Sequence, residues 1–263
     1  MLKLFSATLL MLLAICAHAG DARQEYVLGA GDMVRVVVYG SPDLTTETRV
    51  AAGGTITFPL LGEVAVGGIT AGEAEKKIAA ALENGGFLKQ PQINLVVIQY
   101  QSQMVAVLGD VYKPGRYPLD RPNTLTDVLA MAGGATPNGS EIVTVTSARD
   151  GKSERHEYDL REWFDRGQLS HNPAIRGGDI IYVPRAPLFY IYGEVQRPGA
   201  FRLERSMTVA QALAVGGGLT VRGTERGIRI KRRDVGDVMQ TIKPQSSDTL
   251  QADDVIQVRE SLF

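Results

Sequence analysis

The sequence predicts an α+β protein in which a first domain is followed by two tandem β-grasp-like modules, built from mixed sheets with short helices. The main observation is a repeat: the thirty residues from Val107 to Thr136 recur, without a gap, from Ile191 to Thr220. The offset is 84 residues (191 − 107), and twelve of the thirty positions are identical. The second observation is that short strand patterns alternate with helices that begin at capping boxes. Because the shared residues are turn, cap and core types, the repeat indicates a duplicated structural module rather than a duplicated active site.

Length and composition are those of an ordinary globular protein. The chain has 263 residues, is 44% hydrophobic and carries a formal net charge of −1. This is enough apolar material for two or three small domains, each with its own core. A nucleic-acid-binding protein shows an excess of basic residues, which this chain lacks. We therefore expect no nucleic acid among its partners.

The first nineteen residues have the pattern of a secretory signal peptide. Lys3 is followed by an apolar run from Leu9 to Ile15, and then by Ala17-His18-Ala19 before Gly20. This is the order of a charged region, an apolar region and a small-residue cleavage site. The alternative, a membrane anchor, is disfavoured because the run is too short to span ~30 Å of hydrocarbon. We expect cleavage between Ala19 and Gly20.

Cys16 is the only cysteine of the chain. A lipoprotein signal places a small residue directly before the acylated cysteine, whereas Ile15 stands there in this sequence. We therefore expect no lipid on Cys16, with lipidation as the alternative. After cleavage at Ala19 the mature chain would contain no cysteine, so it would need no disulfide in an oxidising compartment.

The first domain, residues 20–101, reads as a small α+β unit. A β-rich run covers Met33 to Tyr39, and Thr55 to Gly68 reads as a strand, a turn and a second strand. Thr70 and Glu73 then form a capping box at the start of a helix, for which Gly85 is a plausible stop. The residues from 91 to 100 close the domain as another strand.

The two modules, residues 102–185 and 186–263, each begin with an apolar strand that leads to Pro-Gly. Proline fixes φ at the second position of a type II turn and glycine supplies the positive φ of the third position, so both copies predict such a turn. The structural turn residues are therefore Pro114, Gly115, Pro198 and Gly199.

A helix follows in each module and ends at Gly-Gly. Its capping box is Thr124 with Asp127 in the first module and Thr208 with Gln211 in the second. After the first helix, residues 141–160 read as a hairpin that turns at Asp150-Gly151, and a short helix covers residues 160–167. A closing strand ends each module, at residues 180–183 and 255–258.

With these elements placed, the sequence resembles the bacterial outer-membrane polysaccharide export (OPX) family. That family begins with Y-x-L-G-P-G-D, continues with D-L, P-L-L-G and G-x-T-x-x-E, and carries G-x-V-x-x-P-G in its later domains. This chain matches at Tyr26 to Asp32, Asp43-Leu44, Pro59 to Gly62, Gly68 to Glu73, Gly109 to Gly115 and Gly193 to Gly199. It departs at Ala30, where proline is usual, and at Gly53, where aspartate is frequent.

The resemblance implies a polysaccharide export domain followed by two soluble-ligand-binding β-grasp (SLBB) domains. It also implies a non-catalytic homo-oligomer whose modules form ring layers around a channel for exopolysaccharide or capsular polysaccharide. The expected partners are the polysaccharide and an inner-membrane polysaccharide copolymerase that regulates chain length. The expected location is the periplasm of a Gram-negative bacterium, peripherally associated with the outer membrane. The alternative is a soluble periplasmic glycan-binding adaptor that forms no channel.

The C-terminal residues are relevant to the question of an outer-membrane pore. Known members of the family end in an amphipathic helix that builds a pore, and a spanning helix needs about 20 residues. The last predicted strand ends at Val258, which leaves only Arg259 to Phe263. We therefore expect a separate outer-membrane pore protein as a further partner.

Three residues beside the Pro-Gly turns are candidates for contact with glycan or with another subunit: Tyr112, Arg116 and Arg197. Arginine hydrogen-bonds hydroxyls and uronate carboxylates, and aromatic faces stack on sugar rings. The alternative is that all three are solvated turn residues. The run from Ile228 to Asp234 alternates apolar and basic residues, which fits a strand with one charged face that is either solvated or in contact with an anionic glycan.

The sequence predicts no catalytic residue, no metal and no cofactor. His156 and His171 stand in polar stretches without a histidine or cysteine at metal-ligand spacing, and the chain has no G-x-S-x-G or Walker sequence. Asp32, Asp179 and Asp254 each precede a strand, where a turn hydrogen bond is a more common role for aspartate than catalysis.

Overall fold

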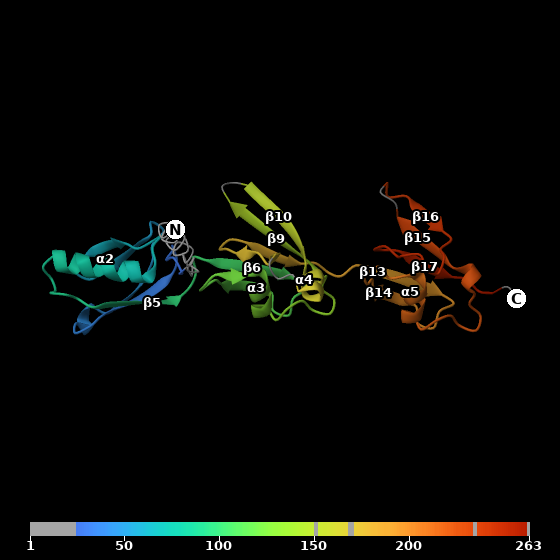
Figure 1. Cartoon of the computed structure of the whole chain (residues 1–263), viewed down its shortest axis with the longest axis horizontal. Helices are drawn as coiled ribbons and strands as arrows, with labels where there is room; N and C mark the ends of the chain where they lie inside the picture. The colour runs from blue at the N-terminus through green and yellow to red at the C-terminus, as the bar shows by residue number, and fades with distance from the viewer. Residues whose placement is uncertain (1–24, 150–151, 168–170, 234–235, 262–263) are drawn as a thin grey trace, which may run out of the picture. The chain divides into compact units, whose positions relative to one another are not determined.

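The computed structural model describes residues 25–149, 152–167, 171–233 and 236–261 (Figure 1). The expected signal peptide, with Cys16 and the Ala19/Gly20 cleavage site, lies outside these residues, and so does the Asp150-Gly151 turn. The chain divides into two compact units. Among the described residues, one unit holds those up to 104 together with segments 118–123 and 174–177, and the other holds those of segments 105–117 and 124–173 and those from 178 onward. The described chain is α+β, as the sequence predicts.

The first domain is built around strand β1 (Met33–Val38), which lies between β2 (Thr46–Arg49) and β5 (Ile93–Gln99) in a three-stranded antiparallel sheet. Alternate side chains of β1 are buried, because successive residues of a strand point to opposite faces. A short 3-10 helix η1 (Pro42–Leu44) and a separate hairpin complete the β-structure. The hairpin strands are β3 (Thr55–Phe58) and β4 (Gly62–Ala65).

Helix α2 (Ala71–Asn84) supplies the rest of this core. The predicted capping box is present: the Thr70 hydroxyl accepts from the Glu73 amide, and the Glu73 carboxylate accepts from the Thr70 amide at 2.8 Å. Ala74, Ile78 and Leu82 recur at helical spacing and are buried against the sheet residues. Gly85 is the C-cap residue, which confirms the predicted stop.

The two modules share one strand order. In the first module the sheet runs β10-β9-β12-β6-β7, and in the second it runs β16-β15-β17-β13-β14, so each strand has a counterpart (Figure 1). The elements of the first module are β6 (Met104–Gly109), β7 (Gly115–Pro118), β8 (Asn123–Thr124), α3 (Leu125–Met131), β9 (Ile142–Arg149), β10 (Lys152–Asp159), α4 (Leu160–Arg166), β11 (Ala174–Ile175) and β12 (Ile180–Val183).

The second module is shorter in its middle. Its elements are β13 (Leu188–Gly193), β14 (Gly199–Arg202), α5 (Val209–Val215), a 3-10 helix η3 (Glu225–Gly227), β15 (Arg229–Arg233), β16 (Met239–Ile242) and β17 (Val255–Val258). Residues 243–254, all described, connect β16 to β17 without a helix. The second copy therefore lacks a counterpart of α4. This explains why the closing strands are offset by 75 residues (255 − 180), whereas the first strands are offset by 84 (188 − 104).

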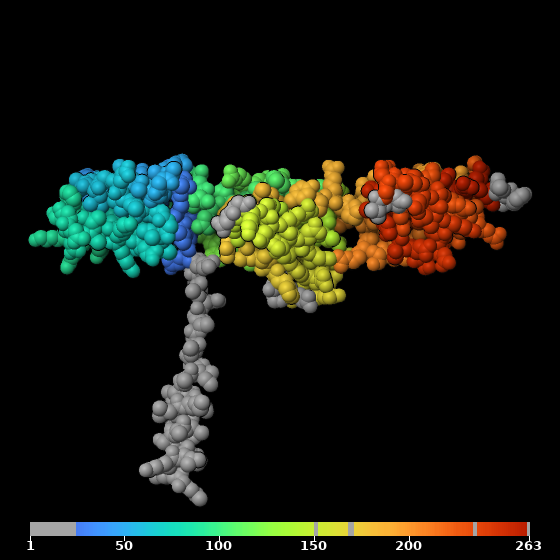
Figure 2. All heavy atoms as spheres, turned by 90° about the horizontal axis from the view of Figure 1, so that it is seen from above, coloured from blue at the N-terminus to red at the C-terminus, as the bar shows by residue number. Residues whose placement is uncertain are grey.

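Each helix covers one face of its sheet. Val209, Ala212 and Leu213 of α5 are buried in one cluster with Ile191, Ile230 and Ile256, which come from three neighbouring strands. Both predicted capping boxes of the modules are present, and both Gly-Gly pairs that end the helices have positive φ. The residues of these cores are at most 9% exposed. The space-filling view shows the closely packed surface atoms of the modules (Figure 2).

The first and the closing strand of each module pair in parallel at the centre of the sheet, β6 with β12 and β13 with β17. The pairing ends at a glycine in the left-handed region: φ is 91° at Gly109 and 94° at Gly193. A Cβ atom at either glycine would collide with the carbonyl group of its paired residue, Val183 or Val258. These two glycines are therefore required by both backbone conformation and space.

The predicted type II turns at Pro-Gly are not present. Gly115 has no positive φ, and at Gly199 φ is 155°, far from the roughly +80° that a type II turn requires. Both glycines are already the first residues of strands β7 and β14, and Gly199 pairs with Ile191. The prediction placed the special conformation six residues too late, because the chain reverses in the segment between Gly109 and Pro114.

Gly109→Ala should therefore lower the free energy of unfolding by about 1–3 kcal/mol, which is typical of a forced backbone conformation. Gly115→Ala, whose added Cβ meets nothing within 4 Å, should change it by less than about 0.5 kcal/mol. Thermal melts of the purified proteins compare the two variants. A larger loss of stability in Gly115→Ala than in Gly109→Ala would support the type II turn instead.

Candidate functional site

The sequence-predicted contact residues lie on the two reversals between paired strands. Tyr112 follows β6 with 61% of its surface exposed, and Arg116 is an exposed residue of β7. Arg197 lies on the matching reversal of the second module, after β13. Within the described part of the chain no hydrogen bond or ion pair joins these three side chains, so the structure does not gather them into one site.

The reversals have a structural role of their own. The amides of Tyr112 and Lys113 donate to Gly134 and Ala132, at 3.1 and 2.9 Å, and the amides of Gln196 and Arg197 donate to Gly218 and Gly216, at 3.0 and 2.8 Å. These carbonyl groups end helices α3 and α5, where the helix itself supplies no donors. The repeated G-x-V-x-x-P-G and Gly-Gly sequences therefore belong to one structural device, a reversal that caps a helix.

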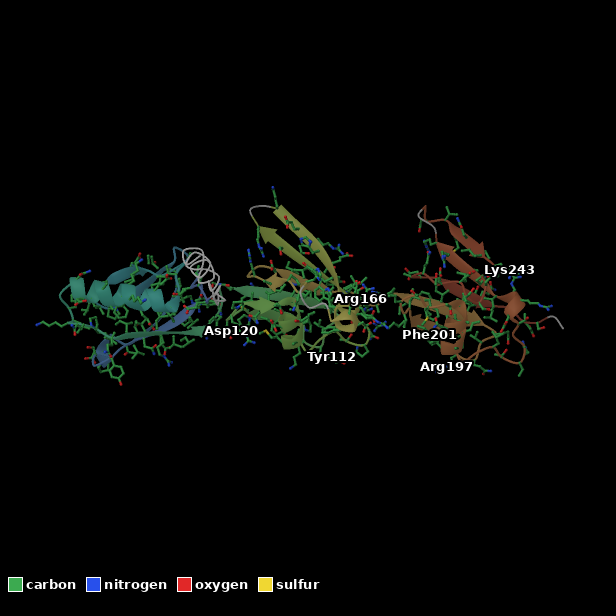
Figure 3. The ribbon with its side chains drawn as sticks, viewed as in Figure 1. Tyr112, Asp120, Arg166, Arg197, Phe201 and Lys243 are labelled. Atoms are coloured by element: carbon green, nitrogen blue, oxygen red, sulfur yellow. The ribbon has the colours of Figure 1, made fainter. Side chains whose placement is uncertain are left out.

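Arg197 strengthens this cap. Its guanidinium donates to the carbonyl of Val215 at 2.7 Å, where a positive charge is favoured at the C-terminal end of a helix. Figure 3 shows Tyr112 and Arg197 on the helix side of their modules. The contact role of Tyr112, Arg116 and Arg197 with glycan or subunit stays a prediction.

Asp32 is fully buried and saturated with hydrogen bonds. Its carboxylate accepts from the amides of Gly29, Gln101 and Ser102, at 2.8–2.9 Å, and from the Tyr26 hydroxyl at 2.7 Å. Burial alone would raise the pKa of Asp32, but these donors outweigh it and hold the pKa below its ordinary value. Asp32 thus joins both ends of the first domain. Its predicted turn role is confirmed, with the ends of the domain as additional partners.

Asp179 and Asp254 are the corresponding buried carboxylates of the two modules. Arg232 binds Asp254 with two nitrogens, at 2.8 and 2.7 Å, and Asp254 also accepts from the amide of Gln251 in its own turn. Asp179 accepts from Arg149 at 2.9 Å. Each closing strand is therefore preceded by a buried aspartate that is neutralised by an arginine of the neighbouring strand. This arrangement is a structural ion pair rather than a proton-transfer site.

The described part of this run, Ile228 to Arg233, has the predicted charged face, because Arg229, Lys231 and Arg233 alternate on one side of the sheet. One basic residue departs from the prediction: Arg232 lies with Ile230 on the buried side, where it meets Asp254. The alternating pattern was correctly interpreted as a strand, here β15. The sequence did not show that one of its basic residues has a buried partner, because Asp254 is twenty-two residues further along the chain.

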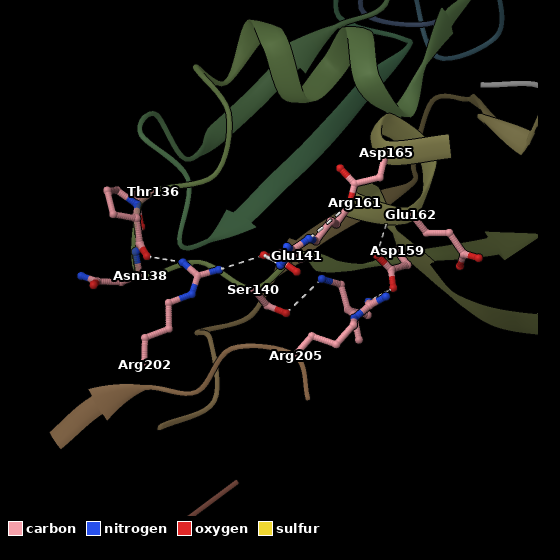
Figure 4. A network of polar contacts seen from close by, with 12 residues as sticks. Thr136, Asn138, Ser140, Glu141, Asp159, Arg161, Glu162, Asp165, Arg202 and Arg205 are labelled. Atoms are coloured by element: carbon pink, nitrogen blue, oxygen red, sulfur yellow. Dashed lines mark hydrogen bonds and ion pairs between the residues drawn. The ribbon is translucent and has the colours of Figure 1, made fainter. Parts of the chain in front are cut away.

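A polar network missed by the sequence analysis lies in the second unit (Figure 4). Arg205 binds the carboxylate of Asp159, and Arg202 binds the carbonyl of Pro137 and approaches Glu141 to 3.6 Å. The guanidinium of Arg161 also forms an ion pair with the Glu141 carboxylate, at 3.4 Å. Together these residues tie the strand β14 region of the second module to the hairpin and α4 of the first module.

Asp159 shows how strongly this network holds its charges. Burial by itself would raise the pKa of Asp159, but the hydrogen bond from Arg205 and the amide of Glu162 lower it below its ordinary value. A cavity of ≈ 230 Å³ lies beside the network, lined among others by Ser140, Pro187 and Arg205. One signal in the sequence pointed here: Arg205 and Arg121 are an identical pair of the repeat.

The described residues contain no group of three or more histidine, cysteine, aspartate or glutamate side chains placed to hold a metal ion. None of the helices formed by these residues is both long and apolar enough to cross a membrane.

The chain matches known sequence families over most of its length. The profile of the polysaccharide biosynthesis/export protein family matches residues 20–98. Profiles of the SLBB domain match residues 103–183 and 188–243.

Curated relatives share about three residues in ten with the chain. The EPS I polysaccharide export outer membrane protein EpsA of Ralstonia nicotianae (strain ATCC BAA-1114 / GMI1000) is 29% identical over 237 residues, which cover 79% of this chain and 61% of EpsA. EpsA of Ralstonia solanacearum is 30% identical over 237 residues, with 79% and 62% covered. The polysialic acid transport protein KpsD of Escherichia coli is 27% identical over 193 residues, with 72% and 34% covered. The chain thus spans about three fifths of the EpsA length.

The buried carboxylate of Asp32 predicts a pH dependence. Because its folded pKa is lowered, its contribution to stability is present above the unfolded value of about 3.9 and is lost as the pH falls through the folded pKa. Asp32→Asn should therefore lower the free energy of unfolding at pH 7 by about 2 kcal/mol. The difference from the unmodified protein should shrink below pH 4. Urea unfolding at several pH values tests this, with the exposed Asp43→Asn as control, and a pH-independent difference would contradict it.

Arg232 and its neighbour Arg233 give a matched pair. Arg232→Leu leaves the fully buried Asp254 without its cation and should cost about 3–5 kcal/mol. Arg233→Leu breaks an exposed pair with Asp237 and should cost less than about 0.5 kcal/mol. Thermal melts of both variants test this prediction. An equal loss of stability in the two variants would show that the buried pair has no special role.

Proposed function

Because the chain belongs to the polysaccharide export family, with an N-terminal polysaccharide export domain followed by two SLBB domains, we propose that it is a non-catalytic part of a conduit that takes an exopolysaccharide or capsular polysaccharide out of the cell. The observation that carries the proposal is the order of the three domains, each matched by its own profile and two of them built on one strand order. The names of the relatives support a polysaccharide as cargo, since EpsA is named for export of EPS I and KpsD for transport of polysialic acid.

The chain works as a homo-oligomer in which copies form ring layers around the polymer. Two features support this. The modules are duplicated, as expected for stacked layers. Aromatic side chains also stand open on the surface, with Tyr112 61% and Phe164 63% exposed, and exposed aromatic residues of this kind are enriched where proteins meet.

The conduit lies in the envelope of a Gram-negative bacterium, and this chain is a periplasmic part that is peripherally associated with the outer membrane. The word "outer membrane" in the names of the relatives supports this location. The partners are the polysaccharide and an inner-membrane copolymerase that regulates chain length. These partners rest on the family resemblance.

Deletion of the gene should abolish polymer in the medium while polymer still accumulates inside the envelope. A plasmid copy of the gene should restore polymer in the medium. Incubating the purified protein with the extracted polymer should leave the chain-length distribution unchanged, because the protein does not cut or extend sugar chains. Normal amounts of extracellular polymer after deletion, or a change in chain length, would contradict the proposal.

Oligomeric state separates the conduit from a glycan-binding adaptor. Size-exclusion chromatography with light scattering and negative-stain images of the purified protein should show closed rings. Tyr112→Ser is a further probe: if Tyr112 contacts another copy, this variant should weaken the rings without changing the melting temperature. A protein that stays monomeric at all concentrations but binds glycan would be the adaptor instead.

A further inference from the structure

The sheet of the second module has one face that no described element covers. Helix α5 packs on the side of Ile191, Ile230 and Ile256, and the side chains on the opposite side of the three central strands are partly or largely exposed. We call the open side the outer face and define it by Tyr190 and Tyr192 of β13, Val255 and Gln257 of β17, and Arg229 and Lys231 of β15. The three strands are neighbours in the sheet (Figure 1).

The strand register fixes how these six side chains lie. Tyr190 is opposite Val255, and Val255 is opposite Lys231, which makes one row across the three strands. Tyr192, Gln257 and Arg229 make the next row. Neighbouring strands are about 4.8 Å apart and alternate residues of a strand about 7 Å apart, so the six side chains form one compact patch.

The patch combines aromatic rings with positive charge. Tyr190 and Tyr192 are 38% and 37% exposed, and the ammonium group of Lys231 lies 5.5 Å from the centre of the Tyr192 ring. A guanidinium nitrogen of Arg229 donates to the carbonyls of Ile228 and Arg226, at 2.8 and 3.4 Å. Among the described outward positions of these three strands, none is acidic. Arg233, the next outward residue of β15, pairs with Asp237, so the positive charge of the patch itself comes from Arg229 and Lys231.

The duplicated module shows that the fold does not require this chemistry. The counterparts of Tyr190 and Tyr192 in β6 are Ala106 and Leu108, at the offset of 84 residues. Across β12, Thr146 and Thr144 of β9 occupy the places of Lys231 and Arg229.

The buried sides, in contrast, are apolar in both copies: Val107, Ile181 and Val145 in the first module match Ile191, Ile256 and Ile230 in the second. The two copies thus keep the same kind of core and differ on the outer face. The shared apolar core therefore does not impose the aromatic and basic residues of the outer face.

On these grounds we propose that the outer face of the second module binds acidic sugar units of the exported polymer, such as uronate or sialate units. The inference rests on the proposed function, which supplies a polysaccharide as the ligand, and it adds the chemical class of the sugar. Tyr190 and Tyr192 would stack on the sugar rings, because an aromatic face attracts the partly positive C–H edge of a sugar. Lys231 and Arg229 would bind the carboxylates, and Gln257 between the strands offers an amide to hydroxyl groups.

Binding of defined oligosaccharides to the purified full-length protein tests this. The probes are galacturonate oligomers, sialic acid oligomers and neutral dextran oligomers of similar length, measured by calorimetry at low and at moderate salt. The unmodified protein should bind the acidic oligomers, with an affinity that falls as salt rises, and should bind dextran at least tenfold more weakly.

Two variants take their residues from the first module, so a sheet of this fold is known to accept them. Arg229→Thr/Lys231→Thr should weaken binding of acidic oligomers at least tenfold and remove most of the salt dependence. Tyr190→Ala/Tyr192→Leu should weaken binding severalfold and leave the salt dependence in place. The matched control, Lys113→Thr/Lys152→Thr, removes the same charge from exposed positions of the first module and should bind like the unmodified protein.

Each other result overturns the inference. The face has no specific role if the control and the Arg229/Lys231 variant both bind acidic oligomers as well as the unmodified protein does. The same conclusion follows if both variants lose binding to the same extent. Equal binding of dextran would exclude an acidic ligand. A variant that changes oligomer size but not oligosaccharide binding would assign the face to contacts between copies.

The proposed function fails separately. If the unmodified gene does not restore polymer in the medium of the deletion strain, the export role is wrong, whatever the oligosaccharides do. If the unmodified gene restores export but the protein shows no preference for acidic oligomers, only the present inference is lost. Thermal melts of every variant keep loss of fold apart from loss of binding.

Discussion

The parallel pairing of the first and the closing strand is the constraint on which each module depends. Two strands that are distant in sequence, β6 and β12 or β13 and β17, must meet at the centre of the sheet, with a helix crossing between them. Where the pairing ends, the backbone comes so close that only glycine fits, at Gly109 and Gly193. The chain must then reverse at once, and the amides of that reversal cap the helix that covers the sheet. One contact therefore explains the glycine, the reversal and the helix end together.

The same pairing explains the buried aspartates. The closing strand enters the centre of the sheet from a tight turn, and the turn carries Asp179 or Asp254 into the interior. A buried carboxylate is costly without a cation, so an arginine of the adjacent strand accompanies each one: Arg149 in the first module and Arg232 in the second. The first domain solves a similar problem differently. Asp32 is held by backbone amides and hydroxyl groups instead of an arginine.

The arginines of the second module therefore have different structural roles, although nothing in the sequence distinguishes them. Arg232 neutralises a buried aspartate, Arg197 caps helix α5, and Arg205 joins the second module to Asp159 of the first. Arg229 has carbonyl partners and lies on the uncovered side of the sheet. This sorting separates structural charges from the charges that remain open to a ligand. In a duplicated module, the side that packs is constrained by the core, while the open side is free to acquire new chemistry.

The sequence by itself determined the elements that depend on local chemistry. Capping boxes such as Thr70 with Glu73, the strands with alternating burial and the Gly-Gly helix ends were all predictable, because each signal lies within a few neighbouring residues. The repeat itself predicted that two modules share one fold, and the motifs in their order indicated the family.

Only the tertiary structure decided which residues serve the fold and which are free. The positive φ lies at Gly109 rather than at Gly115, because it is set by the approach of β12 from far along the chain. The partner of Arg232 and the partner of Arg205 likewise come from distant segments. The outer face could not be recognised from the run of basic residues alone, because the register of three strands decides which side chains share a face. Contacts between residues distant in sequence leave no local pattern, and this is why the sequence determined the elements and the family while the structure decided the roles of their side chains.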